Sequence, residues 1–433
     1  MGANASALRE AARPVGALFE TVRDANVVLV GEATHGTHDF YDLRARLTER
    51  LIAERGFTGV AIEGDLPDAA ALHRYVTGAA GGTLDDALAG FRRFPTWMWR
   101  NTVMCGFVER LRAWNLARPP EGRAGIFGLD LYSLHRSMDE VIAYLRRVDP
   151  ANADAVRERY ACFDRFGGDP QRYGYATEFS PNESCRAAVR EALRAIAERT
   201  GSYATRDGVA AADEAFITEA NARVAADAEA YYRTMFAWDE SSWNVRDRHM
   251  DDTLCRVREH LRETRGADKV VVWAHNSHLG DARATQMGRR GEVNVGQLAR
   301  ERFGDEVLNV GLFTYDGSVI AADDWGEPHR RMTVNAAVPA SYEHLFHSAG
   351  GDLVLDLRDP RVRDVLGGER LERAIGVIYR PRTELRSHYF TADLARQFDI
   401  AVHIDRTRAL EPLDAVEPPA LDGEAPETYP TGV

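Results

Sequence analysis

Lysine is almost absent from this sequence of 433 residues, and its absence narrows the possible chemistry. Lys269 is the only lysine, so arginine supplies the rest of the 54 basic residues. No G-x-x-x-x-G-K motif is present, which excludes a nucleotide site of the P-loop type. A Schiff base with a carbonyl substrate would have to form on Lys269. G-x-S-x-G and G-x-G-x-x-G are missing too, which argues against a serine hydrolase of the usual α/β kind and against a dinucleotide site.

Cysteine is also scarce, and the four cysteines lie far apart in the chain: Cys105, Cys162, Cys185 and Cys255. No two of them form a C-x-x-C pair, which argues against a zinc site or a thiol-redox site built on them. We therefore expect four thiols packed in the protein core.

An excess of basic charge and long apolar runs are lacking as well. The formal net charge is -13 at pH 7, whereas nucleic acids and anionic membranes bind basic patches. No apolar run approaches the roughly 20 residues of a membrane-spanning helix, and residues 1–20 lack the basic-then-apolar pattern of a signal peptide. We expect a cytoplasmic protein with no nucleic-acid or membrane partner. Its oligomeric state stays open.

The first chemical feature is an apolar run, residues 27–30, that breaks into Gly31-Glu32-Ala33-Thr34-His35-Gly36. Four aliphatic residues in a row predict a strand buried on both faces, and a helical pattern follows from about His38. Glycines on both sides let the backbone turn sharply and approach a ligand. The carboxylate and the imidazole are therefore predicted to lie in one loop at the ligand-binding edge of a sheet.

Arg44 falls within an apolar stripe of the following helix, formed by Phe40, Leu43, Leu47 and Leu51. A guanidinium cannot lose its water without gaining partners. Either it extends its head to solvent, or it reaches Glu32, Glu63 or the substrate. We predict that it is buried and paired.

Three further apolar runs also end in polar residues. Residues 60–62 lead to Glu63 and Asp65, and residues 124–129 lead to Asp130. Residues 270–274 lead to His275 and His278. Right-handed crossovers place successive parallel strand ends on one edge of a sheet. Glu63 and His275 are therefore predicted to share one cleft with His35.

These patterns predict an α/β protein with a mainly parallel sheet flanked by helices and a large helical insertion. Residues 1–130 form the first part of the α/β core, 131–265 the insertion and 266–410 the second part of the core. Residues 411–433, rich in proline and acid, are predicted to be a disordered tail. Within the insertion, Arg246 extends an apolar stripe, so we expect it to bind a ligand or to pair with an aspartate.

Two regions could supply the walls of a pocket. The aromatic residues Phe91, Phe94, Trp97 and Trp99 could line it, or they could pack a helix on the sheet. Residues 386–390, which include His388, are predicted to be a polar loop that could close over it. Further strands are predicted at 307–313, 352–357, 376–379 and 400–404.

The chain resembles the erythromycin esterase family in four motifs taken together. They are G-E-x-x-H-G at 31–36, Glu63 after the next strand, H-N-x-H at 275–278 and R-x-H-Y-F at 386–390. The resemblance runs from about residue 20 to about 410. It implies an α/β core with a helical insertion, and hydrolysis of a macrolactone or another ester by water. We expect no metal or other cofactor, because a loop does not impose the i, i+4 geometry of a helical zinc motif and carboxylate–histidine pairs act as general bases without metal. The resemblance also implies a small-molecule substrate and, for macrolides, antibiotic resistance.

By the same resemblance, His35 is the general base, and Glu32, Arg44, Glu63 and His275 match active-site positions of the family. A neutral imidazole can take a proton from water at neutral pH, and Glu32 or Glu63 could hold its tautomer. His275 or Arg44 could stabilise the oxyanion. The predicted substrate-binding residues are His38, Asp65, Trp97, Asp130, Arg246, His278 and His388.

Three alternatives remain open at this level. E-x-x-H-x-x-H at 32–38 and H-x-x-H at 275–278 offer ligands for zinc or another divalent metal. Some proteins similar to this family are assigned to exopolysaccharide biosynthesis. The aromatic residues and buried arginines could also serve a non-catalytic binder of a glycosylated small molecule.

Overall fold

The computed structural model describes residues 2–22, 24–180, 184–204, 208–235 and 242–414. At its centre is an eight-stranded sheet in the order β3-β2-β4-β1-β5-β10-β7, with β6 paired to β5. The strands of this sheet are β1 (Val27–Val30), β2 (Gly59–Asp65), β3 (Gly125–Asp130), β4 (Val270–Trp273), β5 (Val307–Ala321), β6 (Arg330–Val334), β7 (Leu353–Asp356) and β10 (Ile400–Thr407). A separate two-stranded sheet pairs β8 (Arg370–Arg373) with β9 (Tyr389–Ala392).

The six strands from β3 to β10 are parallel, and β6 and β7 pair antiparallel to them. Val30 at the end of β1 is in register with Trp273 of β4 and Val310 of β5. Ile62 of β2 is in register with the same Trp273. Residues 32, 63 and 275 therefore follow strand ends at one edge of the sheet, as expected for parallel strands.

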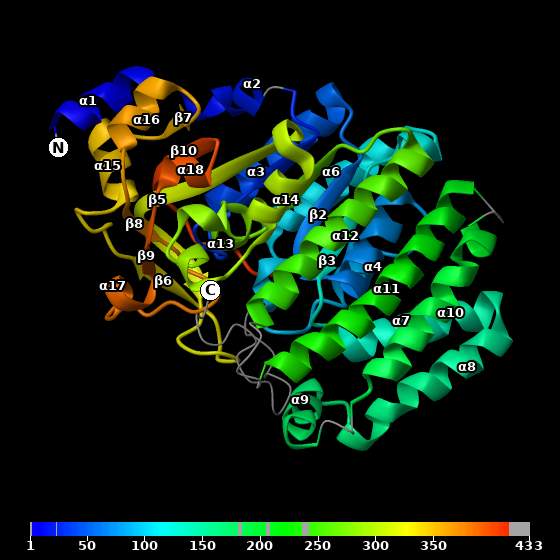
Figure 1. Ribbon diagram of the computed structural model, residues 1–433. Coiled ribbons are helices and arrows are strands. Elements are labelled where there is room, and N and C mark those ends of the chain that lie inside the picture. Colours follow the sequence, from blue (N-terminus) through cyan, green and yellow to red (C-terminus); the bar gives the residue numbers. More distant parts are fainter. Residues whose placement is uncertain (1, 23, 181–183, 205–207, 236–241, 415–433) are drawn as a thin grey trace.

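Side chains that alternate along the strands are buried on both faces of the sheet, which explains the continuous aliphatic runs. Val28 and Val30 pack with α3 (His38–Arg55), α4 (Leu66–Thr77) and α6 (Thr102–Leu116) on one face. Val27 and Leu29 pack with α12 (Ser242–Arg265) and α14 (Val295–Phe303) on the other. Figure 1 shows the resulting layers of helix, sheet and helix.

The end of the sheet formed by β10 and β7 has its own apolar cluster. It is covered by α1 (Gly2–Ala11), α15 (Tyr342–Ala349), α16 (Pro360–Leu366) and α18 (Leu394–Gln397). The shorter helices are α2 (Leu18–Val22), α5 (Leu84–Leu88), α13 (Asn276–Leu279) and α17 (Glu384–Ser387). The helices α1, α15, α16 and α18 thus bring the start and the later part of the chain together at the β10–β7 end of the sheet (Figure 1).

The helical segment predicted at 131–265 packs in two places. Its helices are α7 (Leu134–Val148), α8 (Pro150–Tyr160), α9 (Pro170–Phe179), α10 (Arg186–Ala204), α11 (Gly208–Thr234) and α12. The helices α7 to α11 share one apolar cluster and lie beside the sheet (Figure 1). In contrast, Met250 and Leu254 of α12 pack directly on the strands. The division of the chain at 130 and 265 therefore remains a prediction.

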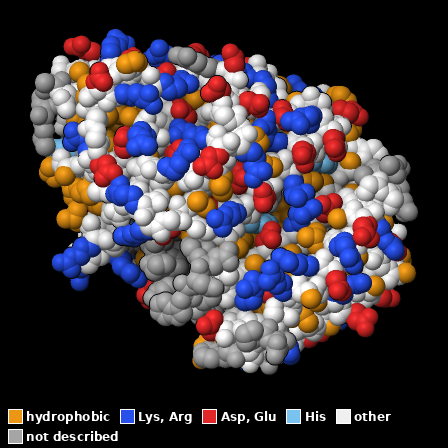
Figure 2. Space-filling view, in the orientation of Figure 1, with side chains coloured by type: hydrophobic (Ala, Val, Ile, Leu, Met, Phe, Trp, Pro, Cys, Tyr) orange, Lys and Arg blue, Asp and Glu red, His pale blue; other side chains and the backbone are white. Residues whose placement is uncertain are grey.

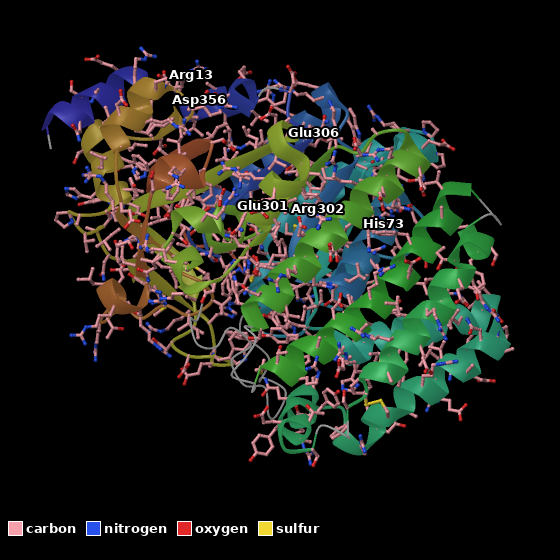
Figure 3. The ribbon with its side chains drawn as sticks, in the orientation of Figure 1. Arg13, His73, Glu301, Arg302, Glu306 and Asp356 are labelled. Carbon is pink, nitrogen blue, oxygen red and sulfur yellow. A yellow bond between two sulfur atoms is a disulfide. The ribbon has the colours of Figure 1, made fainter. Side chains whose placement is uncertain are left out.

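The expectation of four free thiols is wrong for two cysteines. Cys162 and Cys185 form a disulfide within the α7–α11 group, with their Cα atoms 5.9 Å apart (Figure 3). Cys105 and Cys255 are free and half-buried. The bonded cysteines are 23 positions apart in the chain with a helix, α9, between them, so the folded chain brings them together.

Several element boundaries also differ from the predictions. The strand predicted at 307–313 extends to Ala321, and residues 376–379 form no strand. The predicted loop at 386–390 is instead the end of α17 followed by β9. The start of the predicted disordered tail is wrong at residues 411–414, because the backbone of Glu411 and Leu413 forms hydrogen bonds with Thr102 and Arg100. Residues 415–433 lie outside the described residues.

Charges of both signs alternate over the face shown in Figure 2. Among the described helices, none is long and apolar enough to cross a membrane. The visible face therefore shows no field of one sign that would favour a polyanionic partner.

Candidate active site

A cavity of about 70 Å³ lies at the carboxyl ends of β1, β2 and β3. Five of the polar residues singled out in the sequence line it: His35, Glu63, Asp65, Asp130 and Arg246. The loops after three separate strands thus converge on one space, as the parallel sheet predicts.

His35 is held by the carboxylate three residues before it. Its Nδ1–H donates to Glu32 Oε1 at 2.9 Å, and both side chains are buried. This contact leaves Nε2 as the free ring nitrogen of a residue that lines the cavity. The glycines of the motif are needed by close approach: a Cβ at Gly31 would lie 2.1 Å from Asn276 Oδ1, and one at Gly36 would lie 1.8 Å from the Ile320 carbonyl oxygen.

Arg44 is fully buried and paired, as predicted. Its Nη1 lies 3.1 Å from Glu32 Oε2, and its Nη2 donates to the carbonyl oxygen of Ala274 at 2.7 Å. The alternative in which the guanidinium extends to solvent is therefore wrong. We call Glu32, His35 and Arg44 the Glu32 cluster. It ties the first loop to α3 and to the end of β4.

His275 stands beside His35, with their ring centroids 4.8 Å apart. Its Nδ1 accepts the backbone N–H of Ser277 at 3.2 Å, so the ring proton lies on Nε2. Nε2 is near the Ala33 backbone but makes no well-formed hydrogen bond. Burial, followed by repulsion from His35, lowers the pKa of His275 well below its usual value. It is therefore a neutral donor at neutral pH.

Arg246 joins two carboxylates at the cavity wall. Its Nε and Nη2 donate to Asp130 at 3.0 and 2.7 Å, and Nη2 also donates to Glu63 Oε1 at 2.8 Å. Burial alone would raise the pKa of Glu63, but attraction to His278 and Arg246 outweighs burial and holds the pKa well below its usual range. The other oxygen of Glu63 accepts the backbone N–H of His275 at 2.8 Å. Glu63 therefore orients the loop that carries His275.

His278 lies behind this wall, between two carboxylates. Its Nδ1 is 2.9 Å from Asp247 Oδ1 and its Nε2 is 3.3 Å from Glu63 Oε1, while the ring stacks on Trp243 at 4.4 Å. Burial alone would lower the pKa of His278, but attraction to Asp247 and Glu63 outweighs burial and raises the pKa to about 9. We call Glu63, Asp130, Arg246, Asp247 and His278 the Glu63 cluster.

Comparison with known proteins identifies the family of most of the chain. The family model for erythromycin esterase matches residues 52–407. The chain belongs to the erythromycin esterase family. It is 23% identical over 321 residues to erythromycin esterase type II of Escherichia coli, covering 70% of this chain and 72% of that protein. The family supports a hydrolase that acts on a small molecule.

Solved structures share the fold of this erythromycin esterase family chain. A protein of Bacillus cereus has a TM-score of 0.78 at 20% identity and covers 95% of this chain and 98% of its own. A protein described as a succinoglycan biosynthesis protein has a TM-score of 0.76 at 21% identity, with coverages of 94% and 97%. A histidine-to-asparagine mutant of the erythromycin esterase EreC, in its open conformation, has a TM-score of 0.61 at 17% identity, with coverages of 90% and 93%.

Four of the predicted substrate-binding residues do not line the cavity of this family member. Trp97 is fully buried in the core beneath it, and its neighbours Phe91, Phe94 and Trp99 line the space instead. His278 lies in the Glu63 cluster, where it holds Glu63 rather than a ligand. The pattern of aromatic residues gave no means of telling which side faced inward.

His38 and His388 are the other two residues that lie outside the cavity lining. His38 begins α3, and its backbone N–H donates to the carbonyl oxygen of Arg408. His388 accepts the backbone N–H of Arg380 at 3.0 Å through Nε2, and burial lowers its pKa to about 4. Both therefore contact backbone and not the space beside His35.

The sequence did not reveal several lining residues, among them Asp68, Tyr132 and Trp325. Asp68 follows Asp65 by one helical turn, a spacing that could have indicated it. Trp325 lies beyond β5, and nothing in its local sequence connects it with the first loop. Its place depends on tertiary packing alone.

The ligand sets proposed for zinc do not come together. His38 and His278 lie outside the cavity lining, away from the space beside His35. Across the described parts of the chain, no group of three or more His, Cys, Asp or Glu is arranged to hold a metal ion.

Proposed function

We propose that this chain hydrolyses an ester or lactone by direct attack of water, with His35 as the general base. One observation carries the proposal: Glu32 fixes the Nδ1–H tautomer of His35, which leaves Nε2 free at the cavity. A neutral imidazole held in this way is suited to accept a proton from water.

In the proposed step, the water oxygen attacks the ester carbonyl carbon while His35 Nε2 takes a proton from that water. The tetrahedral intermediate then breaks its bond to the leaving oxygen, which receives the proton back from His35. Glu32 stabilises the imidazolium formed between these steps, and Arg44 holds Glu32 in place. His275, predicted to share the cleft, does not line the cavity; its buried ring lies beside that of His35 and helps to hold it in position.

The substrate class follows from the family and the cavity together. Pockets for drug-sized ligands span about 300–1,000 Å³, whereas the cavity here has about 70 Å³. We infer that a small part of the substrate reaches His35 and that the rest of any larger molecule, such as a macrolactone, stays outside. Macrolide inactivation, and with it antibiotic resistance, is the activity that the family name suggests. A cytoplasmic location remains our prediction.

The decisive experiment measures turnover and affinity of wild type and His35→Asn on a panel of esters, lactones and glycolipids. Loss of the base should lower turnover by about 10²–10⁴-fold while affinity changes only a few-fold. Unchanged turnover in His35→Asn would exclude the mechanism. Binding without turnover in either protein would favour the non-catalytic binder.

Chelation tests the proposed independence from metal. We expect equal turnover before and after treatment with a chelator, with elemental analysis of the same sample. Loss of turnover that zinc restores would establish the metal-dependent alternative. Turnover confined to glycolipids would favour a role in exopolysaccharide synthesis, which at present rests on the description of one neighbour of 21% identity.

A further inference from the structure

One carboxylate of the cavity lining has an oxygen with no hydrogen-bond partner among the described residues. Asp65, at the end of β2, lines the cavity and is only 7% exposed. Its Oδ2 accepts the Nε–H of Arg93 at 3.1 Å. Its Oδ1 is buried and makes no hydrogen bond with the described residues. A buried carboxylate oxygen left unpaired is costly, so it indicates a place where a ligand donates.

Charge around the cavity is also out of balance. The carboxylates that line it or lie directly behind it are Glu63, Asp65, Asp68, Asp130 and Asp247. The cations that pair with them are Arg93, Arg136, Arg246 and His278. Among the described residues, these five carboxylates therefore share four cations, which leaves an excess of one negative charge.

Asp68 shows the effect of this excess. It lies one turn of α4 beyond Asp65, is 2% exposed and pairs with Arg136. Burial, and next the charge of Asp65, raise the pKa of Asp68 to about 6 in spite of that arginine. A further cation on this side of the cavity would relieve the repulsion between the two carboxyl groups.

Much of the remaining cavity lining is aromatic. Phe94 and Trp325 meet edge to face with centroids 4.9 Å apart, and Phe91 and Trp99 also line the space. Aromatic faces attract cations, and they exclude the water that would otherwise weaken a carboxylate–ammonium contact. The volume of about 70 Å³ limits the bound group to a few atoms.

We propose that this wall, centred on Asp65, binds a protonated amino group of the substrate while His35 acts on its ester. The proposal rests on the proposed function only in that it assigns the cavity to the substrate. It names the substrate class as an amino ester or amino lactone. Asp65 is then a specificity-determining residue, and Asp68 adds to the attraction when it is ionised.

The first test compares binding of n-butylammonium and n-butanol to the wild-type protein. The two probes match in size and both donate hydrogen bonds, but only the first is charged. Tryptophan fluorescence reports occupancy, since Trp99 and Trp325 line the cavity. We expect the ammonium to bind about tenfold tighter or more, because hydrogen bonds to charged groups are the stronger ones. Equal affinities would overturn the proposal.

The second test uses Asp65→Asn, which should bind both probes equally. Asp364→Asn changes an exposed aspartate of α16 and should keep the wild-type preference. If a thermal melt shows that Asp65→Asn does not fold, Asp65→Ser replaces it, and the wild-type ratio still decides the preference. A preference retained in the folded Asp65 variant would overturn the assignment.

Turnover separates this inference from the proposed function. Wild type should hydrolyse the methyl ester of β-alanine with a lower KM than that of 3-hydroxypropanoic acid, and Asp65→Asn should remove the difference in KM. Ammonium binding without any ester turnover would sink the proposed function alone. Ester turnover without an amine preference would sink this inference alone.

Discussion

The two polar clusters beneath the cavity differ in how completely their hydrogen bonds are made. In the Glu63 cluster, Arg246 donates to both Asp130 and Glu63, and His278 lies between two carboxylates. In the Glu32 cluster, Glu32 Oε2 and Arg44 Nη1 approach to 3.1 Å without a well-formed hydrogen bond. The first cluster is satisfied as it stands. In the Glu32 cluster, Glu32 Oε2 and Arg44 Nη1 can still form a stronger hydrogen bond when His35 becomes protonated.

This contrast indicates different roles for two networks that meet at Ala274 and His275. A satisfied buried network holds one geometry, because any change breaks several charged bonds at once. A network whose hydrogen bonds are incomplete can form stronger ones as charge develops in the transition state, and this lowers the activation free energy. We therefore expect changes in the Glu63 cluster to affect folding first and changes in the Glu32 cluster to affect turnover first.

The largest expected effect is on stability, in Arg246→Met. The variant leaves Asp130 and Glu63 buried without their shared cation, so the free energy of unfolding should fall by about 3–5 kcal/mol. Urea unfolding followed by circular dichroism measures it. Arg262→Met, on the same helix but with an exposed side chain, should change it by less than about 0.5 kcal/mol. Equal losses in both variants would contradict the special position of Arg246.

A smaller effect concerns the pH dependence of stability through His278. Burial alone would lower the pKa of His278, but attraction to Asp247 and Glu63 outweighs burial and raises the pKa to about 9. This value lies above the pKa of about 6.5 in the unfolded chain. The stabilising contribution of His278 is thus fully present below pH 6.5 and is lost as pH rises toward 9. The loss amounts to about 3 kcal/mol. Unfolding curves at pH 6, 7.5 and 9 should show a slope in wild type that is reduced in His278→Gln, and parallel curves would count against the assignment.

The smallest of these effects is kinetic, in Arg44→Lys. An ammonium cannot contact both Glu32 and the Ala274 carbonyl as the guanidinium does. The turnover number should fall about tenfold, while the melting temperature changes little. Arg46→Lys, which replaces an exposed arginine of the same helix, is the control and should leave both unchanged. Wild-type turnover in a folded Arg44→Lys would show that the Glu32 cluster does not need a planar cation.

The sequence was informative where a side chain's surroundings follow from its neighbours in the chain. Apolar runs that end in Glu32, Glu63, Asp130 and His275 indicated both the strands and the shared edge, because parallel strands leave no other arrangement. Arg44 could be predicted as buried and paired because its helix is amphipathic and the residue breaks the pattern. In such cases the periodicity of the local sequence is sufficient to predict whether a side chain is buried.

The sequence was less informative where the surroundings come from distant segments. The choice between Trp97 and Trp99 as wall residues depends on the orientation of a short irregular segment, which has no period to read. The Cys162–Cys185 bond and the β8–β9 pair are made by packing over 23 positions or by strands that flank another helix. Contacts of this kind are properties of the folded chain and leave no local signal.

His35 and the aromatic walls of the cavity come from different parts of the chain. This separation affects how the substrate specificity of such a protein can change during evolution. His35 stands on the edge of the sheet, whereas Phe91, Phe94 and Trp325 come from irregular segments on either side of it. A replacement in these segments alters what fits without moving the sheet edge. Related proteins that keep the same residues at the sheet edge can therefore differ in substrate specificity, some for large lactones and others for small charged esters, without a change in the reaction.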